Sequence, residues 1–101
     1  MIKRIKVQNQ GEFEERLQNK DLRISKAIVE VALKNLKGKK RFIPILEVHL
    51  KDEEQIFDIT MDREDMLQAL KQNLNIHEFH EDYEGCAHIS KAIKELQKEV
   101  I

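Results

Sequence analysis

An alternation of apolar and polar residues in the middle of the chain predicts a β-hairpin. The period of two runs through residues 42–50, breaks at the charged turn 51–54 and returns over residues 55–61. Such a period is typical of strands that bury one face. Joining the strands through the turn places their apolar residues on the same side, which favours one register. The expected pairs are Leu50 with Gln55, Val48 with Phe57, and Leu46 with Ile59.

The second face of this hairpin is predicted to be mixed rather than fully polar. Simple alternation puts Phe42 and Pro44 on the buried face and Ile43, Ile45 and Ile56 on the other face. Isoleucines on an outer face favour cover by another element or by a partner protein. Pro44 has no N–H group to donate, so we expect the strand to lie at an edge there.

Helical spacing dominates the rest of the N-terminal half. A short strand rich in Ile and Val is expected at residues 2–7, followed by a short helix over residues 12–20. Ser25 has the side chain of an N-cap, which predicts a longer, well-buried helix up to about Lys37. Gly38 then stands where helices commonly end.

The C-terminal third predicts two amphipathic helices joined by a turn near residues 75–82. Asp62 is the expected N-cap of the first helix, and the second runs from about Tyr83 to Lys98. Each helix gathers its apolar side chains on one face, so an antiparallel helical hairpin follows. These faces consist of Met66, Leu67, Leu70 and Leu74 in the first helix, and of Tyr83, Cys86, Ile89, Ile93, Leu96 and Val100 in the second.

Together these elements predict one α+β domain over residues 1–101. Residues 1–61 supply a strand, two helices and the β-hairpin, and residues 62–98 supply the helical hairpin. We expect a small antiparallel sheet, built around the hairpin at 41–61, to pack on the helices and to leave room for the N-terminal strand. The length of 101 residues, with 41% apolar and 37% charged residues, agrees with one folded domain.

Several classes of protein do not fit this composition. The chain has no run of about 18 apolar residues, so we expect no membrane span. Its first seven residues alternate charged and apolar side chains, whereas a signal peptide needs an uninterrupted apolar stretch. The single cysteine cannot form an internal disulfide, which is typical of a reducing compartment. The expected location is the cytoplasm.

The small net charge of −1 hides a strong division along the chain. Residues 1–51 carry 13 Lys/Arg against 6 Asp/Glu, an excess of seven positive charges, whereas residues 52–101 carry 5 against 13, an excess of eight negative charges. The two halves could fold against each other and cancel, or they could form a basic face for nucleic acid or for an acidic partner. The densest candidate for phosphate contacts is the basic segment Lys34, Lys37, Lys39, Lys40 and Arg41.

A cluster of possible metal ligands precedes and enters the last helix. The side chains concerned are those of His77, His80, Cys86 and His88. They are suitable zinc donors, but their spacing matches no strong zinc motif. If the last helix begins near Tyr83, Cys86 and His88 point about 200° apart. Cys86 then belongs to the apolar face and His88 to the opposite one, so a metal site is an alternative rather than our first hypothesis.

The sequence offers little else for catalysis. Glu47 and Asp58 fall opposite each other in the predicted hairpin, with His49 nearby, and two acids on a hairpin can hold a catalytic metal. Like charges in such a pair are unfavourable, so a cation, a basic side chain or water is expected beside them. The chain has no nucleophile elbow, phosphate loop or dinucleotide motif. We therefore expect no enzymatic activity and no cofactor.

The helical hairpin resembles a known interaction motif. The segment Glu81-Asp-Tyr-Glu-Gly-Cys-Ala-His-Ile-Ser-Lys-Ala-Ile-Lys-Glu-Leu96 is similar to the second helix of the UVR hairpin of the excision-nuclease B and C subunits. The resemblance covers residues 62–98 and implies a protein-interaction module that pairs through its apolar faces. It departs from the motif at Ser90-Lys91, where the family has Arg-Asp. The matching residues are Asp82, Tyr83, Glu84, Cys86, Ala87, Ile89, Ile93 and Leu96.

The first hypothesis for function is therefore a small, non-enzymatic adaptor of the cytoplasm that binds a protein partner or itself. Its composition, rich in Lys, Ile, Glu and Asn, would suit an accessory protein of a bacterium or phage. The alternatives are nucleic-acid binding through residues 34–41 and metal binding through residues 77–88. The expected contact residues for a partner are Met66, Leu70, Leu74, Tyr83, Ile89, Ile93, Leu96, Ile43, Ile45 and Ile56.

Overall fold

One three-stranded sheet and four helices make up the computed structural model, which describes residues 3–98. The α+β class predicted from the sequence is confirmed. In chain order the elements are β1 (Lys3–Val7), α1 (Gln10–Gln18), α2 (Leu22–Lys34), β2 (Phe42–Leu50), β3 (Gln55–Asp62), the 3-10 helix η1 (Arg63–Asp65), α3 (Met66–Phe79) and α4 (Tyr83–Lys98). Residue Ile2 of the expected first strand and Val100 of the expected last apolar face lie outside the described residues.

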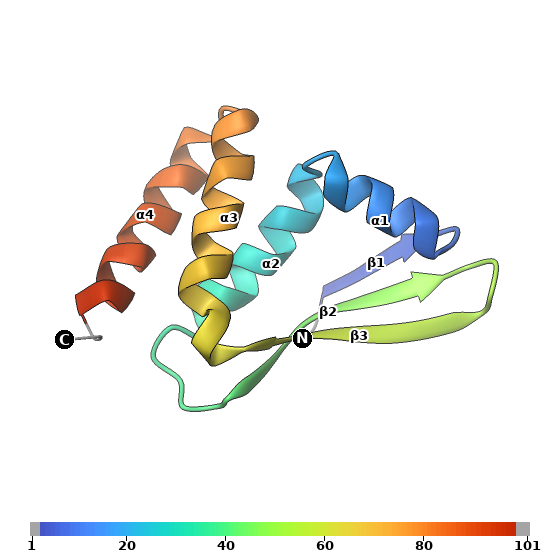
Figure 1. Cartoon of the computed structure of the whole chain (residues 1–101), viewed down its shortest axis with the longest axis horizontal. Coiled ribbons are helices and arrows are strands. Elements are labelled where there is room, and N and C mark those ends of the chain that lie inside the picture. Colours follow the sequence, from blue (N-terminus) through green and yellow to red (C-terminus); the bar gives the residue numbers. More distant parts are fainter. Residues whose placement is uncertain (1–2, 99–101) are drawn as a thin grey trace.

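The strand order β1-β2-β3 puts β2 in the centre of the sheet. β2 and β3 pair antiparallel in the predicted register, with Leu50 opposite Gln55 and Val48 opposite Phe57. β1 joins the sheet and runs parallel to β2, so the sheet is mixed and not purely antiparallel. Parallel pairing needs a long crossover between the two strands, and α1 and α2 provide that connection (Figure 1).

A β-bulge at the start of β2 changes which residues face the core. Pro44 pairs with Thr60 and Leu46 pairs with Ile59, so Ile45 is an extra residue. The bulge shifts the alternation, and Ile43 and Ile45 are only 1% and 2% exposed. Their predicted place on the outer face is therefore wrong. Phe42, expected inside, is 57% exposed for the same reason.

The position of Pro44 agrees with an edge, although β2 is the central strand. β1 pairs with β2 only from Leu46 to Leu50. At Pro44, β3 is therefore the only neighbouring strand among the described residues, and the missing N–H group interrupts no second ladder.

The N-terminal helices begin earlier than the sequence suggested. Asn9 caps α1 through its bond to the Glu12 N–H, and Asp21 caps α2 through its bond to the Ile24 N–H. Ser25, the predicted cap, instead lies inside α2 and is 1% exposed. Its hydroxyl donates to the side-chain oxygen of Asn73 in α3, 2.6 Å away. This buried hydrogen bond fixes α2 against α3.

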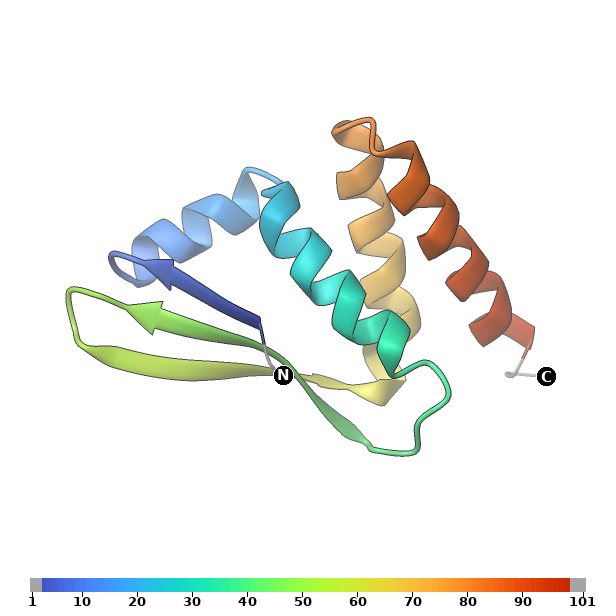
Figure 2. The same cartoon turned by 180° about the vertical axis from the view of Figure 1, so that it is seen from behind.

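The last two helices form the predicted hairpin, with a shorter turn than expected. α3 continues to Phe79, so the turn covers only residues 80–82 instead of 75–82. α2 packs against β2 on one side and against α3 and α4 on another (Figures 1 and 2). No helix within residues 3–98 is long and apolar enough to cross a membrane.

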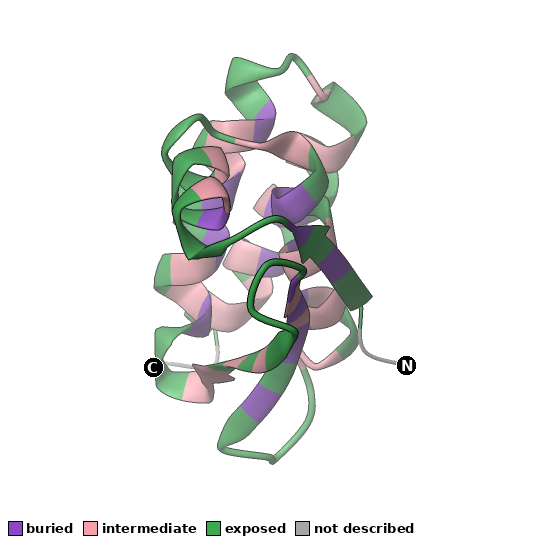
Figure 3. Ribbon diagram, turned by 90° about the vertical axis from the view of Figure 1, so that its right-hand side faces the viewer, coloured by how far each residue is buried: buried purple, intermediate pink, exposed green. Residues whose placement is uncertain are grey.

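A single hydrophobic cluster joins the sheet to all four helices. Figure 3 shows buried positions in the strands and helices, with most residues of the loops exposed. The apolar faces of α3 and α4 belong to this cluster, because Met66, Leu70 and Ile89 are each at most 1% exposed. The chain therefore covers these faces with its own residues.

The bulge leads to a test by substitution. Ile43→Ala should lower the free energy of unfolding by about 2 to 5 kcal/mol, because it empties a buried site. Ile56→Ala should change it by less than about 0.5 kcal/mol, because the Ile56 side chain lies on the surface. Urea denaturation of both variants checks this. Equal effects would show that the two isoleucines share one face, as simple alternation predicts.

Candidate functional site

Four cationic side chains line one cavity at the outer edge of the sheet. The cavity has a volume of about 290 Å³ and lies beside β1, which has no second strand neighbour among the described residues. Arg4 and Lys6 come from β1, Arg16 from α1 and Arg23 from α2, with Ile5 as the remaining lining residue. The fold thus gathers positive charge from positions far apart in the sequence.

Local structure explains why these side chains reach the surface. In β1, Ile5 and Val7 are buried at 8% and 1% exposure, so the alternation of a strand turns Arg4 and Lys6 outward. In α1, Phe13 is buried and Arg16 follows one turn later, partly exposed. Arg23 lies exposed in the first turn of α2.

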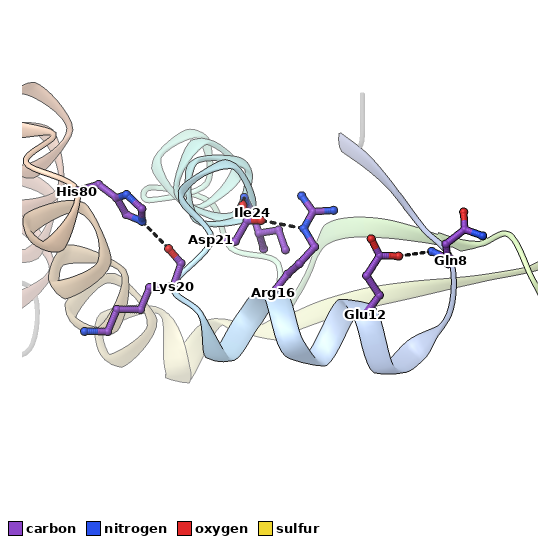
Figure 4. Close-up of polar contacts among 7 residues, drawn as sticks. All are labelled: Gln8, Glu12, Arg16, Lys20, Asp21, Ile24 and His80. Atoms are coloured by element: carbon purple, nitrogen blue, oxygen red, sulfur yellow. Dashed lines mark hydrogen bonds and ion pairs between the residues drawn. The ribbon is translucent and has the colours of Figure 1, made fainter.

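Arg16 is held in place by the residue that also caps α2. Its Nε donates to Asp21 Oδ2 at 2.8 Å, while Asp21 Oδ1 accepts from the Ile24 N–H at 3.1 Å (Figure 4). Burial raises the pKa of Asp21, but the hydrogen bonds from Arg16 and Ile24 outweigh it and hold the pKa below its usual value. Figure 4 shows the two terminal nitrogens of Arg16 pointing away from Asp21. Those nitrogens can therefore bind another anion.

Arg4 is the basic side chain that lies beside the two acids of the hairpin. Glu47 does lie opposite Asp58, as predicted. Glu47 accepts from Arg4 Nε at 3.0 Å and from His49 Nε2 at 2.7 Å. A basic side chain from the N-terminal half thus compensates the like-charge pair.

One face of α2 continues the positive charge away from the cavity. Its residues are three or four positions apart, which makes them neighbours on a helix surface. They are Arg23, Lys26, Glu30 and Lys34. Glu30 is bound by Lys3 at 3.2 Å and by Lys34 at 3.3 Å, and these two contacts lower its pKa. The acid is neutralised locally, and Lys3 ties β1 to α2.

The basic loop after α2 is anchored by a residue that the sequence did not single out. Arg63 donates through Nη1 to the Asn35 carbonyl at 2.6 Å and through Nε to the Lys40 carbonyl. Its own N–H donates to the Arg41 carbonyl at 2.6 Å. The loop backbone is therefore fixed from η1, while the charged side chains from Lys37 to Arg41 stay exposed.

These groups form what we call the basic surface. Figure 2 shows β1, α2 and the following loop on the near side of the molecule. Acids of the C-terminal half border this surface at one point, where Lys26 lines a cavity together with Asp82 and Glu84. The basic surface consists of Lys3, Arg4, Lys6, Arg16, Arg23, Lys26, Lys34, Lys37, Lys39, Lys40 and Arg41.

Most of the residues expected to bind a protein partner are covered within the chain. Met66, Leu70, Ile89, Ile43 and Ile45 are buried within the chain, and their role in binding a partner stays a prediction. Three more are partly buried and pack against the core, namely Leu74, Ile93 and Leu96. The remaining two are exposed, Tyr83 at 73% and Ile56 at 59%.

The four expected metal ligands are not gathered into one cluster. His77 lies in α3 at 2% exposure, not in the loop, and His80 Nε2 donates to the Lys20 carbonyl at 2.6 Å. Burial raises the pKa of the Cys86 thiol. Within residues 3–98, no group of three or more His, Cys, Asp or Glu side chains is placed to hold a metal ion.

His77 and Asp82 instead stabilise the turn of the helical hairpin. His77 Nδ1 donates to Asp82 Oδ2 at 2.8 Å, and Asp82 Oδ1 accepts from the Gly85 N–H at 3.2 Å. The bond from Gly85 and then the bond from His77 hold the pKa of Asp82 below its usual value. A Cβ atom on Gly85 would lie 2.6 Å from His77 Nδ1, so a larger residue there would displace the bond between His77 and Asp82.

The lowered pKa of Asp82 predicts a pH-dependent contribution to stability. The carboxylate form is favoured in the folded chain, so its contribution is complete above the ordinary pKa of 3.8 and is lost as pH falls through the lower folded value. Asp82→Asn should therefore lower the thermal midpoint at pH 7 and lower it less at about pH 3, below the ordinary pKa of 3.8. The same change at Asp65, an exposed residue without a side-chain cap bond, is the control. An Asp82→Asn effect that is equal at both pH values would contradict this role.

Comparisons with known proteins found no relative of this chain. The chain matches no protein-family model, no curated protein and no solved structure. The likeness of residues 62–98 to the UVR hairpin stays a prediction, while the hairpin arrangement of α3 and α4 is shown by the structure.

Proposed function

We propose that this protein binds the phosphate backbone of nucleic acid through the basic surface. The observation that carries the proposal is the convergence of Arg4, Lys6, Arg16 and Arg23 on one cavity, continuous with the charged face of α2. Bringing like charges together costs free energy in the unbound protein, and an anionic ligand offsets that cost. We therefore prefer nucleic-acid binding, an alternative from the sequence, to the adaptor hypothesis.

The length of the basic surface suits a polymer of phosphates. α2 has 13 residues and is therefore about 20 Å long. Phosphates along one strand of a duplex follow each other at about 3.4 Å of helix axis, so α2 alone spans about six of them. The exposed loop to Arg41 extends this length further.

The side chains on this surface favour recognition of the backbone over recognition of bases. Lysine and arginine contact phosphate oxygens irrespective of sequence. Base stacking needs exposed aromatic rings. Among the described residues near this surface, Phe42 is the exposed aromatic residue, and the Arg41 guanidinium lies 5.2 Å from its ring centre. We therefore expect strong dependence on salt and weak dependence on sequence.

Protein binding through the helical hairpin is the second candidate function. It is supported by two aromatic residues on either side of the turn, Phe79 at 63% exposure and Tyr83 at 73%. This contact would use the end of the hairpin and not the apolar faces between its helices.

Charge neutralisation tests nucleic-acid binding. Lys26, Lys37 and Lys40 are exposed, and changing all three to Gln should weaken binding to a labelled single-stranded oligonucleotide of 20 nucleotides. If each lysine contacts one phosphate, the plot of log affinity against log salt should become shallower by about 2. Fluorescence anisotropy between about 50 and 200 mM salt measures both quantities.

The matched control carries the same three changes on the opposite helices, at Lys71, Lys91 and Lys94, which are also exposed. It keeps the net charge of the first variant but leaves the basic surface intact. Equal losses of affinity in the two variants, or binding that does not change with salt, would overturn the proposed function.

A further inference from the structure

We infer that the cavity beside β1 is a binding site for a phosphate monoester, the dianionic group present at the end of a nucleic-acid strand and on a free nucleotide. Binding of the phosphate at a strand end rests on the proposed function, because it requires that the protein binds nucleic acid. The cavity would hold the terminal phosphate, while the rest of the basic surface follows the phosphodiesters.

The charge balance of the cavity matches a dianion. Four cations line it, and two of them, Arg4 and Arg16, are paired with Glu47 and Asp21 respectively. Four positive charges less these two acids leave an excess of two. A phosphate monoester carries about −1.5 to −2 at neutral pH, whereas each internal phosphodiester carries one negative charge. The excess therefore favours the terminal group over an internal one.

The shape of the cavity supports the same ligand. Three elements bound it, so a bound group would be contacted from β1, α1 and α2 together. Its volume of about 290 Å³ is slightly below that of the smallest common small-molecule sites, about 300 Å³. Only one apolar side chain, that of Ile5, lines it. Such a cavity accommodates a phosphoryl group but offers little surface for a base.

Arg16 gives the cavity a preorganised donor. Its Nε is bound to Asp21, its side chain is 25% exposed, and its terminal nitrogens point away from Asp21 (Figure 4). A guanidinium fork fixed in this way can donate two parallel hydrogen bonds to phosphate oxygens with little loss of side-chain entropy. Among the described residues, no carboxylate holds the lysines of the 35–41 loop in this way, so these lysines act as separate point charges.

A comparison of strand ends tests the inference. Three oligonucleotides of 12 nucleotides, with one internal fluorescent label, would carry a 5′-phosphate, a 3′-phosphate or only hydroxyl ends. We expect both phosphorylated forms to bind at least threefold tighter than the hydroxyl form. The cavity reads the phosphoryl group and not its position on the sugar, so the two phosphorylated forms should bind alike.

The variant for this test is Lys6→Gln with Arg23→Gln, because neither residue takes part in the ion pairs of Arg4 and Arg16. It should bring the ratio of affinities to one. Arg16→Gln should do the same, with circular dichroism as the check on folding. The Lys26, Lys37 and Lys40 variant should weaken binding to all three oligonucleotides while keeping the ratio.

Adenosine 5′-monophosphate, with adenosine as its control, separates the two sources of the monoester. NMR shifts of Arg16 and Arg23 with the nucleotide alone, in a protein that binds no oligonucleotide, would support the monoester site and refute the proposed function. Salt-dependent binding of all oligonucleotides with no preference for phosphorylated ends, and no shift with the nucleotide, would overturn the monoester site and leave the proposed function standing.

Discussion

The burial of α2 on two sides is the constraint on which the rest of the structure depends. Ile24, Ser25 and Ala32 are each 1% exposed, because β2 lies on one side of the helix and α3 and α4 lie on another. Burial of this kind stabilises the fold by about 25 cal/mol per Å² of apolar surface. It also leaves one open face, which carries the positive charges. The basic surface is therefore a product of how the core is packed.

Much of the fold could be predicted from periodicity, because periodicity reports which side of an element is buried. The hairpin register and the start of α4 at Tyr83 are confirmed. The failures occur where tertiary contacts override the local pattern. The bulge turns Ile43 and Ile45 into the core. Pro44, next to the extra residue, is a local signal, because prolines in sheets occur at bulges as well as at edges, but the alternation alone does not show the shift. Ser25 has the side chain of a cap, but it lies inside α2 because it bonds to Asn73, 48 residues away.

The candidate site was only partly predictable, for a related reason. The basic segment from Lys34 to Arg41 can be recognised in the sequence because its charged residues lie close together along the chain. The cavity beside β1 combines positions 4, 6, 16 and 23, and only the packing of β1, α1 and α2 brings them together. The charge division along the chain was the one available signal. In contrast, the four expected metal ligands are close only in sequence. α3 extends through His77 and so separates this residue from the others.

We propose that the open side of α2, with β1 and the following loop, is the surface that binds an anionic polymer. The most direct measurement is amide chemical-shift mapping of ¹⁵N-labelled protein during titration with an unlabelled single-stranded oligonucleotide. We expect shifts confined to β1, the exposed face of α2 and residues 35–41. Shifts confined to the turn between Phe79 and Tyr83, or none at saturating oligonucleotide, would contradict this proposal.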